Sequence, residues 1–264
     1  MGDSIAAGTS LPTSPSADGI KAKITRLIGT AFDVVDFGYP GFQVPGVMSD
    51  YTNTGGAVYN AARPKNYFLL QGGANDIQAD DPTFGGPNTL TGAQLATRFQ
   101  TGLNTASTTG YDTIANTVLA WGGLGYDETI RNACNDAMIG GGFTRDFLCD
   151  IGGNALFDGI PATANLTYYI SDTVHLSAEG NRIWAQEIVR TIGADSGLDL
   201  LAVFDCNASY TLGETITPVN IPFGGTGAKS WNWKWNGSSI STSQNPTYTC
   251  LLYTSDAADE AYDV

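Results

Sequence analysis

The sequence of 264 residues is poor in basic side chains, and this scarcity limits the partners to be expected. Twelve lysines and arginines stand against 26 aspartates and glutamates, so the formal net charge is −14. A negative field of this size repels phosphate backbones and anionic lipid surfaces. We therefore expect neither nucleic acid nor a membrane surface as a partner, and a neutral or cationic partner fits better.

The sequence also lacks a long apolar run and is poor in charged residues overall. No run reaches the roughly 20 apolar residues that a helix needs to cross a bilayer, so no membrane span is predicted. Apolar residues still make up 42% of the chain, which suffices for a globular core. Only 14% of the residues are charged, against about 25% in average soluble domains. This composition favours a secreted or cell-surface protein, although the chain opens with no signal peptide and a cytoplasmic location stays open.

Metal-binding patterns are missing as well. The four cysteines show no C-x-x-C spacing, and one histidine, His175, cannot complete a zinc cluster with them. A structural zinc site is therefore not expected. Cys134 and Cys149 fall on separate predicted elements and could form a disulfide, but we favour free thiols, because a buried thiol is the commoner state of such residues.

Apolar periodicity predicts alternating helices and strands over the larger part of the chain. The predicted helices are residues 17–28, 92–106, 126–138 and 177–192. The predicted strands are residues 32–37, 66–71, 117–121 and 146–151. Such alternation is typical of an α/β domain with a doubly wound parallel sheet, which binds ligands at the carboxyl ends of its strands.

The C-terminal part of the chain has the pattern of a separate β domain. Trp231, Trp233 and Trp235 alternate with polar residues, and Asn236-Gly237 is a strong hairpin signal. The stretch resembles the opening strands of a polycystic-kidney-disease or immunoglobulin-like β-sandwich. We interpret the tryptophans as core-facing aromatics, with a sugar-stacking surface as the alternative.

The last fifteen residues differ again. They carry four acidic and no basic side chains and follow neither a strand nor a helix period. Their sequence CLLYTSDAADE resembles the translation of a sequencing adaptor, so we expect a non-native tail, with a genuine acidic tail as the alternative. The predicted division of the chain is an α/β domain (1–193), a linker (194–202), a partial β domain (203–249) and this tail (250–264).

Gly2-Asp3-Ser4 is the first candidate for chemistry. A serine at a tight strand-to-helix turn presents its Oγ at the edge of the sheet, and its backbone N–H can stabilise an oxyanion. Glycine, aspartate and serine are also ordinary turn residues, so the motif alone does not establish a nucleophile.

His175 is the only histidine and hence the only candidate base for such a serine. Imidazole titrates near neutrality and can take the serine proton. Asp172, three residues earlier, can accept the other ring N–H and stabilise the imidazolium. The alternative is a surface or capping histidine beside an ordinary loop aspartate.

Two further segments follow predicted strands and could stabilise an oxyanion. Gly73-Ala-Asn75-Asp76 brings the Asn75 amide to the carboxyl end of a strand, where a neutral donor can hold the oxyanion. A plain turn is the alternative. After the strand predicted at 32–37, Gly38 or Gly41 could offer a backbone N–H, because glycine lets the backbone approach a ligand closely.

Taken together, these four blocks resemble the SGNH, or GDSL-type, hydrolase family. The pattern of that family is GDS, a glycine after the second strand, GxND and DxxH, found here at residues 2–4, 41, 73–76 and 172–175. The resemblance spans roughly residues 1–193. It implies a flavodoxin-like three-layer α/β/α fold and ester hydrolysis, with no metal or organic cofactor.

The resemblance also implies a role for each catalytic residue. Ser4 would attack the ester carbonyl, His175 would act first as general base and then as general acid, and Asp172 would orient His175. The expected partner is a small-molecule or carbohydrate ester.

The oxyanion hole implied by the resemblance has three donors, the backbone N–H of Ser4, the backbone N–H of Gly41 and the side chain of Asn75. Gly41 is preferred because the family often places this glycine at the end of a G-x-x-G turn that leaves the strand. Gly38 and Gly46 stay open as alternatives.

The start of the chain departs from the family pattern. In that family an apolar first strand leads into GDS, whereas only Met1 precedes Gly2 here. We therefore expect Met1 to be internal to a longer gene. The chain would then lack an interior strand, and parallel sheets need every interior ladder filled.

The leading functional hypothesis is a serine esterase that hydrolyses acyl or acetyl esters through an acyl-enzyme intermediate. A carbohydrate ester is suggested only by the appended β domain, which is an analogy. The alternative from another class is a catalytically silent, glycan-binding surface or phage-associated module. Thioesterase or acyltransferase chemistry would use the same residues.

Overall fold

The computed structural model describes residues 1–8, 19–28, 32–123, 126–193 and 195, and four short strands beyond residue 214. The chain forms two compact units, Met1–Ile192 and Gly193–Val264. All residues of the predicted active site belong to the first unit. Among the helices that the structure describes, none has the length and apolarity to cross a membrane.

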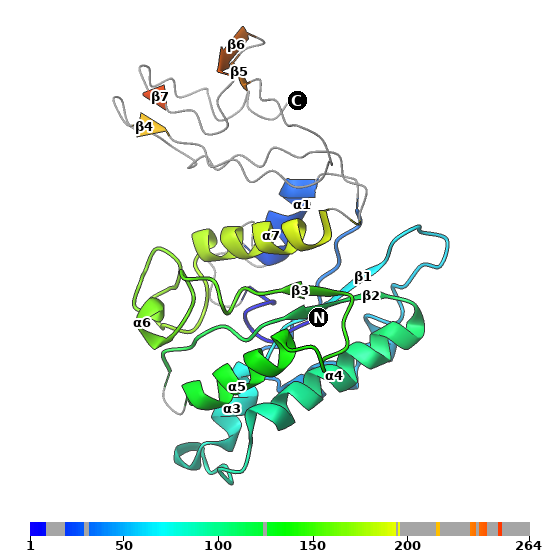
Figure 1. The fold of residues 1–264 in the computed structure, drawn as a ribbon, viewed down its shortest axis with the longest axis vertical. Helices are drawn as coiled ribbons and strands as arrows, with labels where there is room; N and C mark the ends of the chain where they lie inside the picture. Colours follow the sequence, from blue (N-terminus) through cyan, green and yellow to red (C-terminus); the bar gives the residue numbers. More distant parts are fainter. Residues whose placement is uncertain are drawn as a thin grey trace. The chain divides into compact units, whose positions relative to one another are not determined.

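A parallel sheet forms the centre of the first unit (Figure 1). Its strands are β1 (Tyr67–Leu70), β2 (Asp112–Asn116) and β3 (Phe147–Cys149), in this order, and each runs parallel to its neighbour. Four of the five residues of β2 are buried. A central parallel strand is covered on both faces, which explains why polar and apolar residues do not alternate along it.

Met1 continues the sheet beyond β1. The Met1 amino group donates a hydrogen bond to the carbonyl of Leu69 (2.8 Å), and the N–H of Gln71 donates to the carbonyl of Met1 (3.0 Å). These two bonds have the slanted pattern of a parallel ladder. The residues that follow Met1 therefore leave the sheet at the same edge as the residues that follow β1.

Gly2 extends the pairing by one more segment, which contains Gly38 and lies on the side of Met1–Gly2 away from β1. Its N–H donates to the carbonyl of Phe37 (3.1 Å), and its carbonyl accepts from the N–H of Tyr39 (2.8 Å), which makes a parallel bridge with Gly38. A Cβ at Gly38 would lie 2.4 Å from Ala7, so only glycine fits beneath the turn that contains Ser4.

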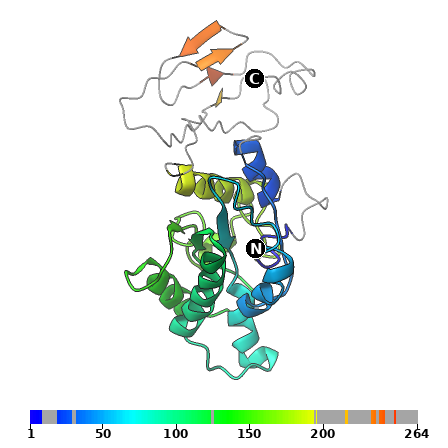
Figure 2. The same cartoon turned by 90° about the vertical axis from the view of Figure 1, so that its right-hand side faces the viewer.

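Helices cover both faces of the sheet (Figures 1 and 2). On one face lie α1 (Ile20–Ile28) and α7 (Ala178–Gly193), and on the other lie α2 (Val44–Ser49), α4 (Gly92–Thr109) and α5 (Glu128–Ile139). The shorter helices are α3 (Ala74–Asp80), α6 (Ile160–Thr163), η2 (Tyr51–Asn53) and η3 (Pro82–Phe84). This arrangement buries apolar side chains on both faces of the sheet, which makes three layers.

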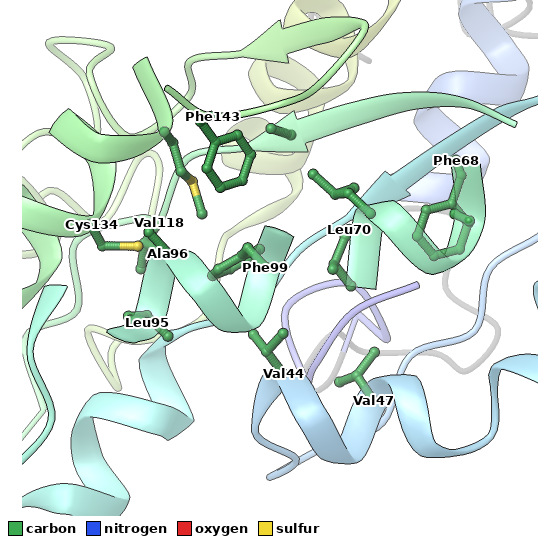
Figure 3. Close-up of a cluster of buried hydrophobic side chains, with 14 of the residues drawn as sticks. Val44, Val47, Phe68, Leu70, Leu95, Ala96, Phe99, Val118, Cys134 and Phe143 are labelled. Carbon is green, nitrogen blue, oxygen red and sulfur yellow. The ribbon is translucent and has the colours of Figure 1, made fainter. Parts of the chain in front are cut away.

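Two apolar cores result from these layers. The first joins β1 and β2 to α2, α4 and α5, and Figure 3 shows Phe99 of this core near Leu70 and Val44. The second joins β2 and β3 to α1 and α7, around the fully buried Trp184. Cys134 lies in the first core and Cys149 in the second, both as buried free thiols, so the preferred prediction for these cysteines is confirmed.

Local sequence signals account for the limits of the longest helix, α4. The hydroxyl of Thr91 accepts the N–H of Gln94 (3.2 Å), and the Gln94 side chain accepts the N–H of Thr91 (2.7 Å), which is a capping box. The helix ends at Gly110, whose φ of +111° is a left-handed conformation that favours glycine.

The predicted α/β class with a parallel sheet is confirmed. The four predicted helices correspond to α1, α4, α5 and α7, with ends that differ by up to three residues. The strands predicted at 66–71 and 146–151 correspond to β1 and β3.

The strand predicted at 117–121 is wrong, because the strand lies earlier, at β2. Residues 118–121 are buried all the same. The backbone of Val118 bonds to a side chain and not to a strand. The Asn135 carboxamide accepts the N–H of Val118 (2.8 Å) and donates to its carbonyl (3.0 Å). Burial without strand pairing therefore produced the apolar run that the prediction relied on.

The strand predicted at 32–37 is also wrong. This segment joins the sheet only through the bridge between Gly38 and Gly2, and its remaining residues line a cavity of about 340 Å³. The lining includes Phe32, Val34 and, from β1, Leu69. The expected absence of an interior strand stays a prediction.

The second unit contains two short antiparallel ladders within the described residues. β4 (Thr215–Ile216) pairs with β7 (Tyr248–Thr249), and β5 (Trp233–Trp235) pairs with β6 (Ser238–Ser241). The predicted tail, Trp231 and all of the predicted linker except Asp195 lie outside the described residues. The division into domains and the immunoglobulin-like assignment stay predictions.

Candidate active site

Ser4 and His175 meet although 171 residues separate them in the sequence. The Oγ of Ser4 lies 2.9 Å from Nε2 of His175. Ser4 follows the Met1–Gly2 ladder and lies in a turn in which the N–H of Ala7 donates to the carbonyl of Asp3 (3.1 Å). This turn begins immediately after the Met1–Gly2 ladder, so the Ser4 hydroxyl lies at the sheet edge, within hydrogen-bond distance of His175.

Asp172 contacts the other side of the imidazole. Its Oδ2 lies 2.7 Å from Nδ1 of His175, while its Oδ1 accepts the backbone N–H groups of Val174 and His175, both at 2.9 Å. A carboxylate at Nδ1 favours the tautomer with the proton on Nδ1. Nε2 is then free to accept the proton of the Ser4 hydroxyl.

The electrostatics of the pair suit this arrangement. Partial burial acts to raise the pKa of Asp172, but the hydrogen bonds from the ring and backbone of His175 and from Val174 outweigh it and hold the pKa below its ordinary value. Asp172 is therefore ionised at neutral pH. An ionised carboxylate beside His175 stabilises the imidazolium that forms when the ring takes a proton.

The loop that carries His175 is anchored to the sheet edge. The N–H of Gly122, beyond β2, donates to the carbonyl of Thr173 (2.9 Å), and the N–H of Ile170 donates to the carbonyl of His175 (2.9 Å). Thr173 has a φ of +59°, a left-handed conformation that is uncommon for a β-branched residue. Strained backbone of this kind concentrates at functional sites, where the surrounding contacts enforce it.

Asn75 lies in the first turn of α3, directly after β1. Its Nδ2 donates a hydrogen bond to the carbonyl of Phe42 (3.1 Å). A carboxamide carries two N–H donors, so one remains for a ligand while the other fixes the side chain.

Gly41 lies beside Phe42 with a φ of +78°, and a Cβ at this position would have no atom within 4 Å. The two alternative glycines have different surroundings, because Gly38 packs against Ala7 and Gly46 lies within α2. The structure thus joins Ser4, Asp172 and His175 by direct hydrogen bonds, and it joins Asn75 to the Gly41 loop through Phe42.

Two buried carboxyl groups beside these residues were not predicted as functional. Asp3 is 1% exposed, its Oδ1 accepts the N–H of Ile5 (2.9 Å) and its N–H donates to Oε1 of Gln71 (3.1 Å). Burial raises the pKa of Asp3 to about 6, although its hydrogen bonds oppose the rise. The second buried carboxyl group belongs to Asp76, the residue that follows Asn75. Both belong to the GDS and GxND blocks, so the motifs contained the signal, but their burial depends on tertiary contacts.

Within the described ranges, no group of three or more histidine, cysteine, aspartate or glutamate side chains is placed to hold a metal ion.

Comparison with known proteins gives matches among solved structures. No protein-family model and no curated protein matches the chain. A structure from Parabacteroides merdae, described as a GDSL-like lipase, has a TM-score of 0.54 and 12% identity, over 73% of this chain and 93% of that one. A structure from Desulfitobacterium hafniense, described as a lipolytic protein of the G-D-S-L family, has a TM-score of 0.51 and 14% identity, over 72% and 95% of the two chains.

A third match is Axe2, an acetylxylan esterase from Geobacillus stearothermophilus. It has a TM-score of 0.51 and 20% identity, over 75% of this chain and 92% of that one. At these identities the matches show a shared fold, which extends over nearly the whole length of each of the three structures.

Proposed function

We propose that the chain is a serine ester hydrolase of the SGNH type, with Ser4 as the nucleophile. The observation that carries the proposal is the chain of two short contacts, from Ser4 Oγ to His175 Nε2 at 2.9 Å and from His175 Nδ1 to Asp172 Oδ2 at 2.7 Å. A serine hydroxyl is a weak nucleophile unless an adjacent base takes its proton, and this geometry supplies that base and its orienting carboxylate. The fold shared with GDSL-type lipolytic proteins and with an acetylxylan esterase supports the proposal.

In the proposed acylation step, Ser4 Oγ bonds to the ester carbonyl carbon while Nε2 of His175 takes the hydroxyl proton. The tetrahedral intermediate collapses as the carbon–oxygen bond to the alcohol breaks, and His175 gives its proton to the departing alcohol. Asp172 stabilises the imidazolium between these two transfers. In the deacylation step, water attacks the acyl group, His175 takes its proton and returns it to Ser4, and the carboxylic acid leaves.

The proposed oxyanion hole combines the N–H of Ser4, the N–H of Gly41 and the free N–H of the Asn75 carboxamide. These donors carry no titrating charge, so their effect on the developing oxyanion is the same across the pH range in which His175 can act as a base. Asn75 is the best supported of the three, because the carbonyl of Phe42 already orients its amide.

The proposed substrate is an ester of a small molecule or a carbohydrate. The name of Axe2 says that this protein acts on acetylated xylan, and the names of the other two matches refer to lipids, so the shared fold serves more than one acyl group. Thioesters and acyl transfer would use the same three residues, and a panel of acyl esters and thioesters would rank them.

Hydrolysis of p-nitrophenyl acetate, with fluorophosphonate labelling in parallel, tests the proposal. We expect the chain to hydrolyse the ester and to be labelled at Ser4, and Ser4→Ala to lose both. Ser107→Ala, which removes an exposed hydroxyl of α4, is the matched control and should keep both. Unchanged hydrolysis in Ser4→Ala would overturn the assignment of the nucleophile. Absence of both hydrolysis and labelling in the unaltered chain would favour the silent, glycan-binding alternative.

A further inference from the structure

Two of the three candidate oxyanion donors, Gly41 and Asn75, lie on different segments of the chain, and a buried carboxylate connects these segments. Asp76 follows Asn75 in α3, and its side chain is fully buried. Its Oδ2 accepts the backbone N–H of Val44 (2.9 Å), and its Oδ1 accepts Nη1 of Arg98 (2.7 Å). A buried carboxylate is costly unless its oxygens are partnered, and here each oxygen has a partner.

The contact with Val44 replaces a local helix cap. Val44 is the first residue of α2, and the preceding residue, Gln43, makes no side-chain capping bond. The first N–H groups of a helix have no partner within the helix, and usually a nearby side chain accepts them. At α2 the acceptor comes from α3 instead, so the start of α2 is held at a fixed distance from α3. The Val44 side chain is fully buried in the core shown in Figure 3, which fixes the other side of the same residue.

A second link runs beside the first. Asn75 Nδ2 binds the carbonyl of Phe42, while Asp76 binds the N–H of Val44, so two adjacent residues of α3 hold two points of one short loop. Gly41, at the start of this loop, has a left-handed φ and an open side. Without the carboxylate, the bond from Asn75 to Phe42 would be the remaining one of these two links from α3, and the direction of the other Asn75 N–H would follow the movements of the loop.

Arg98 completes the arrangement from α4. The Arg98 side chain is 35% exposed and that of Asp76 is fully buried, so the guanidinium reaches Asp76 from the protein surface. The cation compensates the buried negative charge, and the carboxylate can keep both its contacts.

We propose that Asp76 is a positioning residue that sets the distance between the Gly41 loop and Asn75, and that Arg98 supports it. The inference rests on the proposed function and deepens it, because it explains how two separate elements could form one oxyanion hole. Asp76 itself touches no reacting atom. Its effect should therefore appear in the transition state, where the hole acts, and much less in the binding of the uncharged ester.

Asp80 provides a matched control within the same helix. It is buried (8% exposed), and its two oxygens accept the backbone N–H groups of Thr89 (3.1 Å) and Leu90 (2.7 Å). Asp76→Asn and Asp80→Asn each neutralise a buried carboxylate of α3 that binds backbone N–H. Only Asp76 binds the loop of Gly41.

The first experiment measures kcat, KM and the inhibition constant of a boronic acid, which mimics the tetrahedral intermediate, for both variants. We expect Asp76→Asn to lower kcat by about 10- to 100-fold and to weaken the boronic acid in proportion, with KM within about threefold, because small misplacements at an active site cost rates of this order. Asp80→Asn should keep kcat within about twofold. Equal losses in both variants, or an unchanged kcat in Asp76→Asn, would overturn the inference.

Two further measurements keep the test decisive. If Asp76→Asn does not fold, Arg98→Gln leaves the carboxylate in place and removes its cation, and a kcat equal to that of the unaltered chain would contradict the inference. The amide NMR signals of Gly41 and of the Asn75 side chain need no turnover. They should shift in Asp76→Asn and not in Asp80→Asn, so unchanged signals overturn the positioning role even if the chain proves not to be an esterase. A missing fluorophosphonate label at Ser4, by contrast, counts against the proposed function alone.

Discussion

Replacement of Asp3 by asparagine should change how the stability of the protein depends on pH. Asp3 directly precedes Ser4 and is 1% exposed. Its Oδ1 accepts the N–H of Ile5, whereas its Oδ2 has no hydrogen-bond partner in the described part of the chain. Burial therefore raises the pKa of Asp3 from 3.8 to about 6, against the smaller effects of its hydrogen bonds.

The sign of the effect follows from the protons bound in the two states. Between pH 4 and pH 6 the native protein keeps the Asp3 proton that the unfolded chain has released, so the native state binds more protons. The free energy of unfolding then falls as the pH rises through this window. The two pKa values correspond to about 3 kcal/mol between strongly acidic and neutral pH, of which about 2 kcal/mol develops between about pH 4.5 and 7.5.

Urea denaturation of the unaltered chain and of Asp3→Asn at pH 4.5, 6.0 and 7.5 measures this contribution. Every other titrating group is the same in both chains, so the difference between their free energies of unfolding isolates Asp3. We expect the variant to gain about 2 kcal/mol relative to the unaltered chain from the lowest pH to the highest, or about 4–8 °C in Tm.

The absolute stability of Asp3→Asn is a separate matter, because the new amide N–H groups lie where Oδ2 lacks a partner and can cost about 1–3 kcal/mol at every pH. Only the change of this difference in unfolding free energy with pH therefore tests the pKa of Asp3. The difference between the two free energies of unfolding should change by about 2 kcal/mol over this pH range. A change below about 0.5 kcal/mol, a quarter of that value, would show that the Asp3 carboxyl is not held in a desolvating site.

Two further results are expected. Asn75→Ala removes one proposed oxyanion donor and should lower kcat by about 10²- to 10³-fold, whereas Asn104→Ala, on the exposed face of α4, should not; equal kcat values would remove Asn75 from the oxyanion hole. Burial raises the pKa of Cys134 to about 12 and that of Cys149 well above its ordinary value, so both thiols should resist iodoacetamide in the native protein and react after denaturation. Peptide mapping resolves the two sites, and rapid native alkylation of either would contradict its burial.

The predicted helices were accurate because their signals are local. The capping box of α4 lies within four residues, and the apolar stripes of α4 and α7 repeat every three to four residues. Such signals do not depend on what the helix packs against.

The strand predictions failed where apolar character had another cause. Val118 is buried, but its backbone bonds to the Asn135 side chain and not to a strand, whereas Phe32 and Val34 are only partly buried and line a cavity. A short apolar run alone therefore does not tell whether the backbone pairs with a neighbouring strand.

The sequence by itself determined the local helices, the α/β alternation and the side chains worth testing, because caps, periodicity and short motifs are readable within a few residues. Only the tertiary structure decided that Ser4 and His175 lie 2.9 Å apart, and that Asp3 and Asp76 are buried beside them. Distances between segments far apart in the chain, and the desolvation that shifts a pKa, arise from the packing of the sheet and its helices. They are properties of the assembled layers, which no single segment of the sequence contains.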